Sequence, residues 1–174
     1  MKKLVIIAIS IIVGLVTVLY VNEFVKGTIA SLLLGKNIVY SLKGIIFTAI
    51  IPFTKESNLL VIWSIFSIPL ILSITFIELS SFSLKKIINL NLRAGVIIFE
   101  LINLGFIIAN IFTGILSVLL KNSFTNGWSI LFLRSGFLYE KQLIVMMLIL
   151  ILTLTYVNFT VNRLKNYLTI IKRK

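Results

Sequence analysis

Residues 94–120 decide the fold, with the sequence AGVIIFELINLGFIIANIFTGILSVLL and a single charged residue, Glu100. A helix needs about 20 mostly apolar residues to cross about 30 Å of hydrocarbon. Three further runs meet this requirement, at residues 4–21, 57–79 and 142–161. Because backbone amides must be paired in lipid, these runs are expected to be helical despite their many β-branched residues. We therefore predict an all-α integral membrane protein built as a four-helix transmembrane bundle.

The composition of the whole chain supports this class. Of its 174 residues, 59% are hydrophobic and 13% are charged, and the mean hydropathy is +1.14, well above the usual makeup of a soluble domain. The length suits one membrane domain, residues 1–174. Lys2 and Lys3 resemble the start of a signal peptide, but no small-residue cleavage site follows them. We expect an uncleaved anchor.

Residues 22–56 form the ambiguous part of the chain. Apolar residues recur there at helical spacing beside Glu23 and Lys26, which favours a helix lying in the membrane interface. Residues 38–53 are nearly apolar but short for a span, and they contain Lys43. We predict an interfacial or re-entrant segment between the first and second spans. A fifth crossing, in which Lys43 would extend its amine to the interface, is the alternative.

The distribution of basic residues predicts the orientation. Both the four-span and the five-span models place the loop with Lys85, Lys86 and Arg93, and the basic tail at residues 162–174, in the cytoplasm. The frequent Ile, Asn, Lys and Phe are typical of an AT-rich genome. We expect the inner membrane of a bacterium, with an organellar inner membrane as the alternative.

The side-chain inventory excludes several chemistries. The chain has no His, no Cys and no Asp, so it lacks the usual ligands of zinc, haem and iron–sulfur clusters and the residues of a catalytic triad. Ser83 and Lys86 match an S-x-x-K pattern, but four residues match easily by chance. The net charge of +12 is dispersed among short loops, which argues against nucleic acid. We expect no metal, no cofactor and no enzymatic activity.

One face of the helix at residues 94–120 gathers its strongly polar residues. At about 100° per residue they fall within an arc of about 120°. The members of the arc are Arg93, Glu100, Asn103, Asn110, Gly114, Ser117 and Lys121. Because polar groups avoid acyl chains, the arc should point into the bundle, into a water-filled cavity or at another subunit. An unpaired carboxylate at mid-membrane costs a few kcal/mol, so Glu100 should be protonated, hydrogen-bonded or paired.

The second span also carries polar residues on one face, at Ser64, Ser67, Thr75 and Glu78. Small hydroxyl residues let helices approach closely. Glu78 lies at the cytoplasmic end, where we expect a structural ion pair with Arg93, Lys85 or Lys86. The two tryptophans, Trp63 and Trp128, lie near span ends and are expected to be interfacial anchors.

These patterns favour a non-catalytic membrane subunit or assembly component that acts through helix packing with partner membrane proteins or in a homo-oligomer. Glu78, Arg93, Ser64 and Ser67 are the candidate helix-contact or ion-pair residues. The alternative is a small oligomeric cation or proton transporter or channel, with Glu100, Asn103, Asn110 and Ser117 as its ligand or ion site. An intramembrane enzyme using serine–lysine or glutamate chemistry is the least favoured class.

Overall fold

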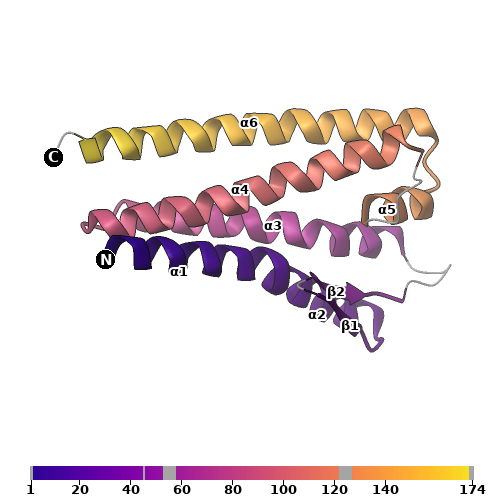
Figure 1. Cartoon of the computed structure of the whole chain (residues 1–174). Helices are drawn as coiled ribbons and strands as arrows, with labels where there is room; N and C mark the ends of the chain where they lie inside the picture. Colours follow the sequence, from indigo (N-terminus) through magenta and orange to yellow (C-terminus); the bar gives the residue numbers. More distant parts are fainter. Residues whose placement is uncertain (1, 45, 53–57, 122–126, 173–174) are drawn as a thin grey trace.

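The computed structural model describes residues 2–44, 46–52, 58–121 and 127–172, which are mostly helical. Within these residues, four helices are long and apolar enough to cross a membrane: Lys3–Leu34, Leu59–Leu84, Leu90–Leu119 and Tyr139–Leu168. They form an elongated bundle with both chain ends at one end (Figure 1). The prediction of four membrane-length helices is confirmed. Ser57, the expected first residue of the second span, lies outside the described residues.

The first long helix is continuous through three labelled parts: α1 (Lys2–Val16), η1 (Thr17–Val21) and α2 (Asn22–Leu34). The η1 segment is a π-helical turn, in which the Asn22 N–H donates to the Thr17 carbonyl five residues back. Neither proline nor glycine occurs in residues 17–22, so the helical hydrogen bonding continues. Residues 22–34 therefore extend the first helix, whereas the sequence had placed an interfacial segment from residue 22 onward.

The helix is followed by a β-hairpin, so the expectation of an all-α protein is wrong here. The strands β1 (Val39–Lys43) and β2 (Ile46–Ile50) pair antiparallel, with Val39 opposite Ile50 and Lys43 opposite Ile46. Gly44 adopts a φ of 62°, which suits the tight connection. Two five-residue strands reach only about 17 Å, so the alternative of a fifth membrane helix is also wrong. Residues 53–56 of this segment lie outside the described residues.

The other three long helices are α3 (Leu59–Leu84), α4 (Leu90–Leu119) and α6 (Tyr139–Lys172). α4 is central, since it packs against α1, α3 and α6. Residues 162–172, expected as a tail, continue α6; Arg173 and Lys174 are outside the described residues. Three apolar clusters follow one another along the bundle, around Ile111 and Phe132, around Ile77 and Leu104, and around Leu84 and Ile97.

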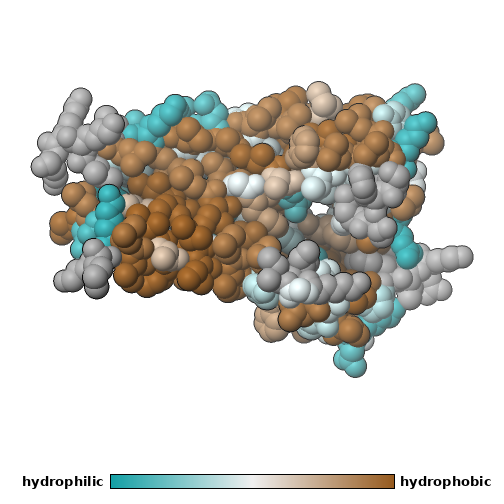
Figure 2. Space-filling model, viewed as in Figure 1, coloured by the Kyte–Doolittle hydropathy of each residue, from teal (hydrophilic) through white to brown (hydrophobic). Residues whose placement is uncertain are grey.

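The helix α5 (Gly127–Ser135) closes the end of the bundle opposite the termini. Its Leu131 and Phe132 are buried against the core. The indole of Trp63 on α3 donates to Ser135 Oγ at 3.1 Å. Figure 2 shows apolar surface along the sides of the bundle and hydrophilic residues gathered toward its two ends.

Candidate functional site: a polar seam between the helices

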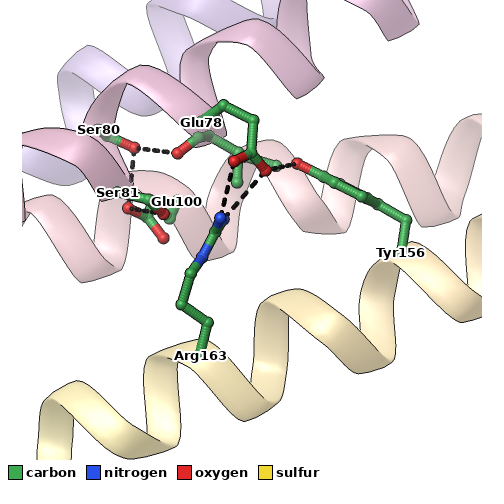
Figure 3. Close-up of polar contacts among 7 residues, drawn as sticks. Glu78, Ser80, Ser81, Glu100, Tyr156 and Arg163 are labelled. Atoms are coloured by element: carbon green, nitrogen blue, oxygen red, sulfur yellow. Dashed lines mark hydrogen bonds and ion pairs between the residues drawn. The ribbon is translucent and has the colours of Figure 1, made fainter.

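We call the polar side chains that meet between α3, α4, α5 and α6 the polar seam; they are Glu78, Ser80, Ser81, Glu100, Asn110, Trp128, Tyr156 and Arg163. Glu100 belongs to the part of the seam between α3 and α4. Its side chain is fully buried, with 0% of the residue exposed. Oε1 accepts hydrogen bonds from the hydroxyls of Ser80 and Ser81 on α3, both at 2.9 Å (Figure 3). Among the described residues, Oε2 has no hydrogen-bond partner. The carboxyl group therefore links α4 to α3 through one oxygen and leaves the other without a donor.

A second cluster joins α3 to α6 (Figure 3). Arg163 donates to both oxygens of Glu78, with Nη1 to Oε2 at 2.7 Å and Nη2 to Oε1 at 3.1 Å. The Tyr156 hydroxyl lies 2.8 Å from the same Oε1 and donates to it. A bidentate arginine–carboxylate pair fixes geometry as well as charge. This cluster therefore holds the two helices in one register.

The ion-pair partner differs from the basic residues that the sequence analysis placed opposite Glu78. Arg93 instead donates through Nη2 to the Ile87 carbonyl at 2.7 Å. Lys86 lies over the Phe82 ring, 4.7 Å from its centroid. Arg163 reaches Glu78 because α6 returns along the bundle to the end where α3 finishes. Arg93 and the lysines were predicted because they lie close to Glu78 in the sequence. The contact is made instead by Arg163, because α6 lies beside α3 at this depth.

The middle of the α4 arc faces the interior, whereas Lys121 at its end is exposed. Asn103 and Ser117 are fully buried, and Gly114 packs against Met146 and Trp128. Asn103 Nδ2 donates to the Phe99 carbonyl of its own helix at 3.0 Å. Asn110 is half-buried, and its Oδ1 accepts from Trp128 Nε1 at 2.9 Å. The arc thus meets several helices at different depths and does not form one cluster.

Within the part of the chain that the structure describes, the two candidate serines of α3 hydrogen-bond to their own helix. Ser64 is exposed and donates to the Leu60 carbonyl, and Ser67 donates to the Ser64 carbonyl. The cross-helix contact of this region is one that the sequence analysis missed. Asn22 Nδ2 donates to Ser73 Oγ at 3.2 Å, and both residues are fully buried. The only sequence signal for this contact was the position of Asn22, a polar residue directly after the apolar run at residues 4–21.

A cavity of about 480 Å³ lies near the α5 end of the bundle, and it too was missed. Its walls come from α2, α3, α4, α5 and α6, and both tryptophans line it. At its edge Lys26 pairs with Glu23 Oε1, and Glu23 Oε2 accepts from the Ala49 N–H of β2 at 3.0 Å. The sequence analysis predicted Trp63 and Trp128 as interfacial anchors, and the side chains of both line this cavity.

The fold and the seam define a helical bundle whose long helices are apolar enough to span a membrane and whose polar side chains gather inside. In the part of the chain that the structure describes, no group of three or more acidic side chains is placed to hold a metal ion. No protein-family model matches the chain, and neither the curated proteins nor the solved structures contain a match.

Proposed function

We propose that the chain is an integral protein of a bacterial inner membrane, with both ends and the α3–α4 connection in the cytoplasm. The apolar sides of the bundle support this location (Figure 2). Basic residues support the orientation, because Lys85, Lys86, Arg163 and Lys165 gather toward the end that holds the termini. Cytoplasmic ends of membrane helices carry such an excess of Lys and Arg.

In this membrane we propose a non-catalytic subunit or assembly component. Much of the polar seam is occupied by contacts within the chain: Glu100 with two serines, Glu78 with Arg163, and Asn110 with Trp128. Interhelical hydrogen bonds in membrane proteins contribute about 0.6 kcal/mol each on average. The arrangement of these contacts supports a role in holding α3, α4, α5 and α6 together rather than a catalytic role.

We propose that a partner protein binds the outward face of α6. Asn158 and Asn162 are both exposed, and Asn162 Nδ2 donates to Asn158 Oδ1 at 3.2 Å. Thr155 is exposed one turn earlier. Asn158 lies about 7.5 Å along the helix from Arg163, toward the middle of the span. Because amides are disfavoured against acyl chains, a polar strip facing outward supports a neighbouring transmembrane helix that hydrogen-bonds to it.

The test replaces both amides, as Asn158→Leu with Asn162→Leu. We expect the complex extracted from native membranes in mild detergent to lose mass on a native gel, while the chain itself stays folded. Thr75→Leu on α3 is the matched control, since Thr75 is also exposed and donates to the Ile71 carbonyl of its own helix. A complex of unchanged mass in the double variant would reject the partner role of this face.

One observation favours a second function, a proton or cation site. Glu100 Oε2 and Asn103 Oδ1 are buried acceptors without a hydrogen-bond partner among the described residues, and they lie one turn apart on α4. Unpaired buried oxygens are the groups that a proton or a cation would satisfy. Glu100→Gln deletes the titratable charge and keeps the shape. Unchanged ion flux in reconstituted vesicles would reject this function; Glu140→Gln, at an exposed position on α6, is the control.

A further inference from the structure

The cavity near the α5 end has the size and lining of a ligand site. Its volume of about 480 Å³ falls in the usual range of small-molecule sites, about 300–1,000 Å³. Figure 2 shows the molecular surface hollowed between the α2 side and the α4–α5 side. Nothing in the polar seam described above requires this space, so the cavity needs its own explanation.

The walls of the cavity suit an apolar chain. Aromatic and aliphatic side chains from four helices face it, among them Phe66 and Leu70 from α3, Phe106 from α4, Leu131 from α5 and Ile149 from α6. Burying apolar area against such walls contributes about 25 cal/mol per Å². An occupant with a flexible hydrocarbon chain would gain most from this lining.

The lining of the cavity includes fixed charges of both signs. Glu23 and Lys26 form an ion pair near the start of α2, and their side chains keep 22% and 11% of their exposure. The Ala49 N–H holds the Glu23 carboxylate in place. Because the pair is neutral overall, its electrostatic complement is a headgroup that also carries both charges. A ligand with a single charge would lie beside one residue of opposite charge and one residue of like charge.

The depth of these groups matches the orientation of a lipid-like molecule. Glu23 lies about 30 Å along the first helix from Lys3, at the level expected for the far headgroup region. The apolar wall residue Ile71 lies only about 20 Å along α3 from its end at Leu84. Polar groups therefore stand at headgroup depth, and apolar walls reach below them toward the middle of the bilayer.

We propose that this cavity binds a single-chain amphiphile with a zwitterionic headgroup, taken from the leaflet opposite the chain ends. Lys26 would face the anionic part of the headgroup and Glu23 the cationic part, and the chain would lie against Phe66 and Phe106. A cavity of this volume suits a ligand of drug size and is small for a lipid with two chains. The inference rests on the proposed membrane location and is independent of the proposed subunit role.

The two tryptophans of the chain make the binding measurable, because Trp63 and Trp128 both line the cavity. The full chain in nanodiscs is titrated with lysophosphatidylcholine brominated on its chain, which quenches a nearby indole. We expect quenching that saturates at a low mole fraction. Phosphatidylcholine brominated on both chains should quench only in proportion to its mole fraction. A lysolipid curve that is also proportional would overturn the proposal.

Two serines on α3 provide a matched pair of variants. Ser67 lines the cavity, whereas Ser64, one turn away, is exposed, and both hydroxyls donate to a carbonyl of their own helix. Ser67→Phe should weaken lysolipid binding at least about tenfold, and Ser64→Phe should leave it within about twofold. Ser67→Leu replaces Ser67→Phe if the larger ring prevents folding. Equal effects at the two positions would overturn the proposal.

The headgroup assignment has its own test. Glu23→Gln with Lys26→Gln removes both charges without changing the net charge, and Glu140→Gln with Lys141→Gln does the same at exposed positions on α6. The first pair should weaken binding of the brominated lysolipid about fivefold or more and leave a brominated fatty alcohol unaffected. The second pair should change neither. Unchanged lysolipid affinity in the first pair would overturn the zwitterionic assignment. Membrane location is tested separately by the labelling experiment below.

Discussion

Arg163 on α6 and Glu78 on α3 are separated by 85 residues in the sequence and joined by two hydrogen bonds, at 2.7 and 3.1 Å. α6 packs mainly on α4, so this pair is a direct polar tie between α6 and α3. The Glu78 side chain keeps 45% of its exposure. The pair is only partly buried, so its contribution should lie between those of a surface and a buried ion pair.

Arg163→Met and Glu78→Gln, alone and together, measure this tie. We expect each single change to lower the free energy of unfolding by about 1–2 kcal/mol, since charge-assisted bidentate bonds are lost. In a double-mutant cycle followed by denaturant unfolding in detergent, the coupling energy should be near 1 kcal/mol. A coupling close to zero would show that the pair does not hold α6 to α3.

The serines that bond to Glu100 are expected to stabilise the α3–α4 contact modestly. Ser80→Ala with Ser81→Ala removes two interhelical hydrogen bonds, each worth about 0.6 kcal/mol on average, so the loss should be about 1 kcal/mol. Ser83→Ala is the control, because its hydroxyl is exposed and donates to the Leu79 carbonyl. The prediction fails if the control costs as much unfolding free energy as the double change.

Close packing of α1 on α4 depends on Gly95. A Cβ there would lie 2.5 Å from Ser10 Oγ and 2.9 Å from Ile6 Cγ2, whereas a Cβ at Gly105 meets nothing within 4 Å. Gly95→Leu should cost about 1–3 kcal/mol of unfolding free energy through overpacking. Gly105→Leu, on the same helix, should be neutral or stabilising because leucine favours helix more than glycine does. Thermal unfolding of the two variants provides the comparison, and equal midpoints would contradict it.

The proposed topology places the α3–α4 connection and the start of α6 on opposite sides of the membrane. The chain contains no cysteine, so single substitutions give clean labelling sites, and Lys86 and Glu140 are both exposed. A membrane-impermeant thiol reagent should label Glu140→Cys in spheroplasts and Lys86→Cys only after lysis. Labelling of both before lysis would reject the topology.

Local periodicity made part of the seam predictable. The spacing of Glu100, Asn103 and Ser117 places them on one helix face, and all three are buried. The partners of the two carboxylates could not be predicted. Ser80 contacts Glu100, and Arg163 contacts Glu78, only after α3, α4 and α6 have packed. A sequence pattern records the face of one helix, but it does not record which helix comes to lie beside it.

The hairpin and the cavity were missed for different physical reasons. Residues 38–53 are a short apolar run, and periodicity alone does not separate a strand from a helix in such a run. Gly44, with its positive φ, was the available turn signal. The cavity is formed by residues from five helices, and such a space leaves no trace in the order of residues along any one of them.

The π turn at residues 17–21 has a consequence for how the first helix tolerates changes in length. Thr17 and Asn22 are both buried although five positions separate them, a step that an uninterrupted α-helix would carry about 140° around its axis. Deleting one residue from this turn would leave Thr17 and Asn22 four positions apart, the spacing of one ordinary α-helical turn, so everything after it would keep its face. A deletion in the α-helical part before the turn would instead rotate Glu23 and Lys26 by about 100° away from the hairpin.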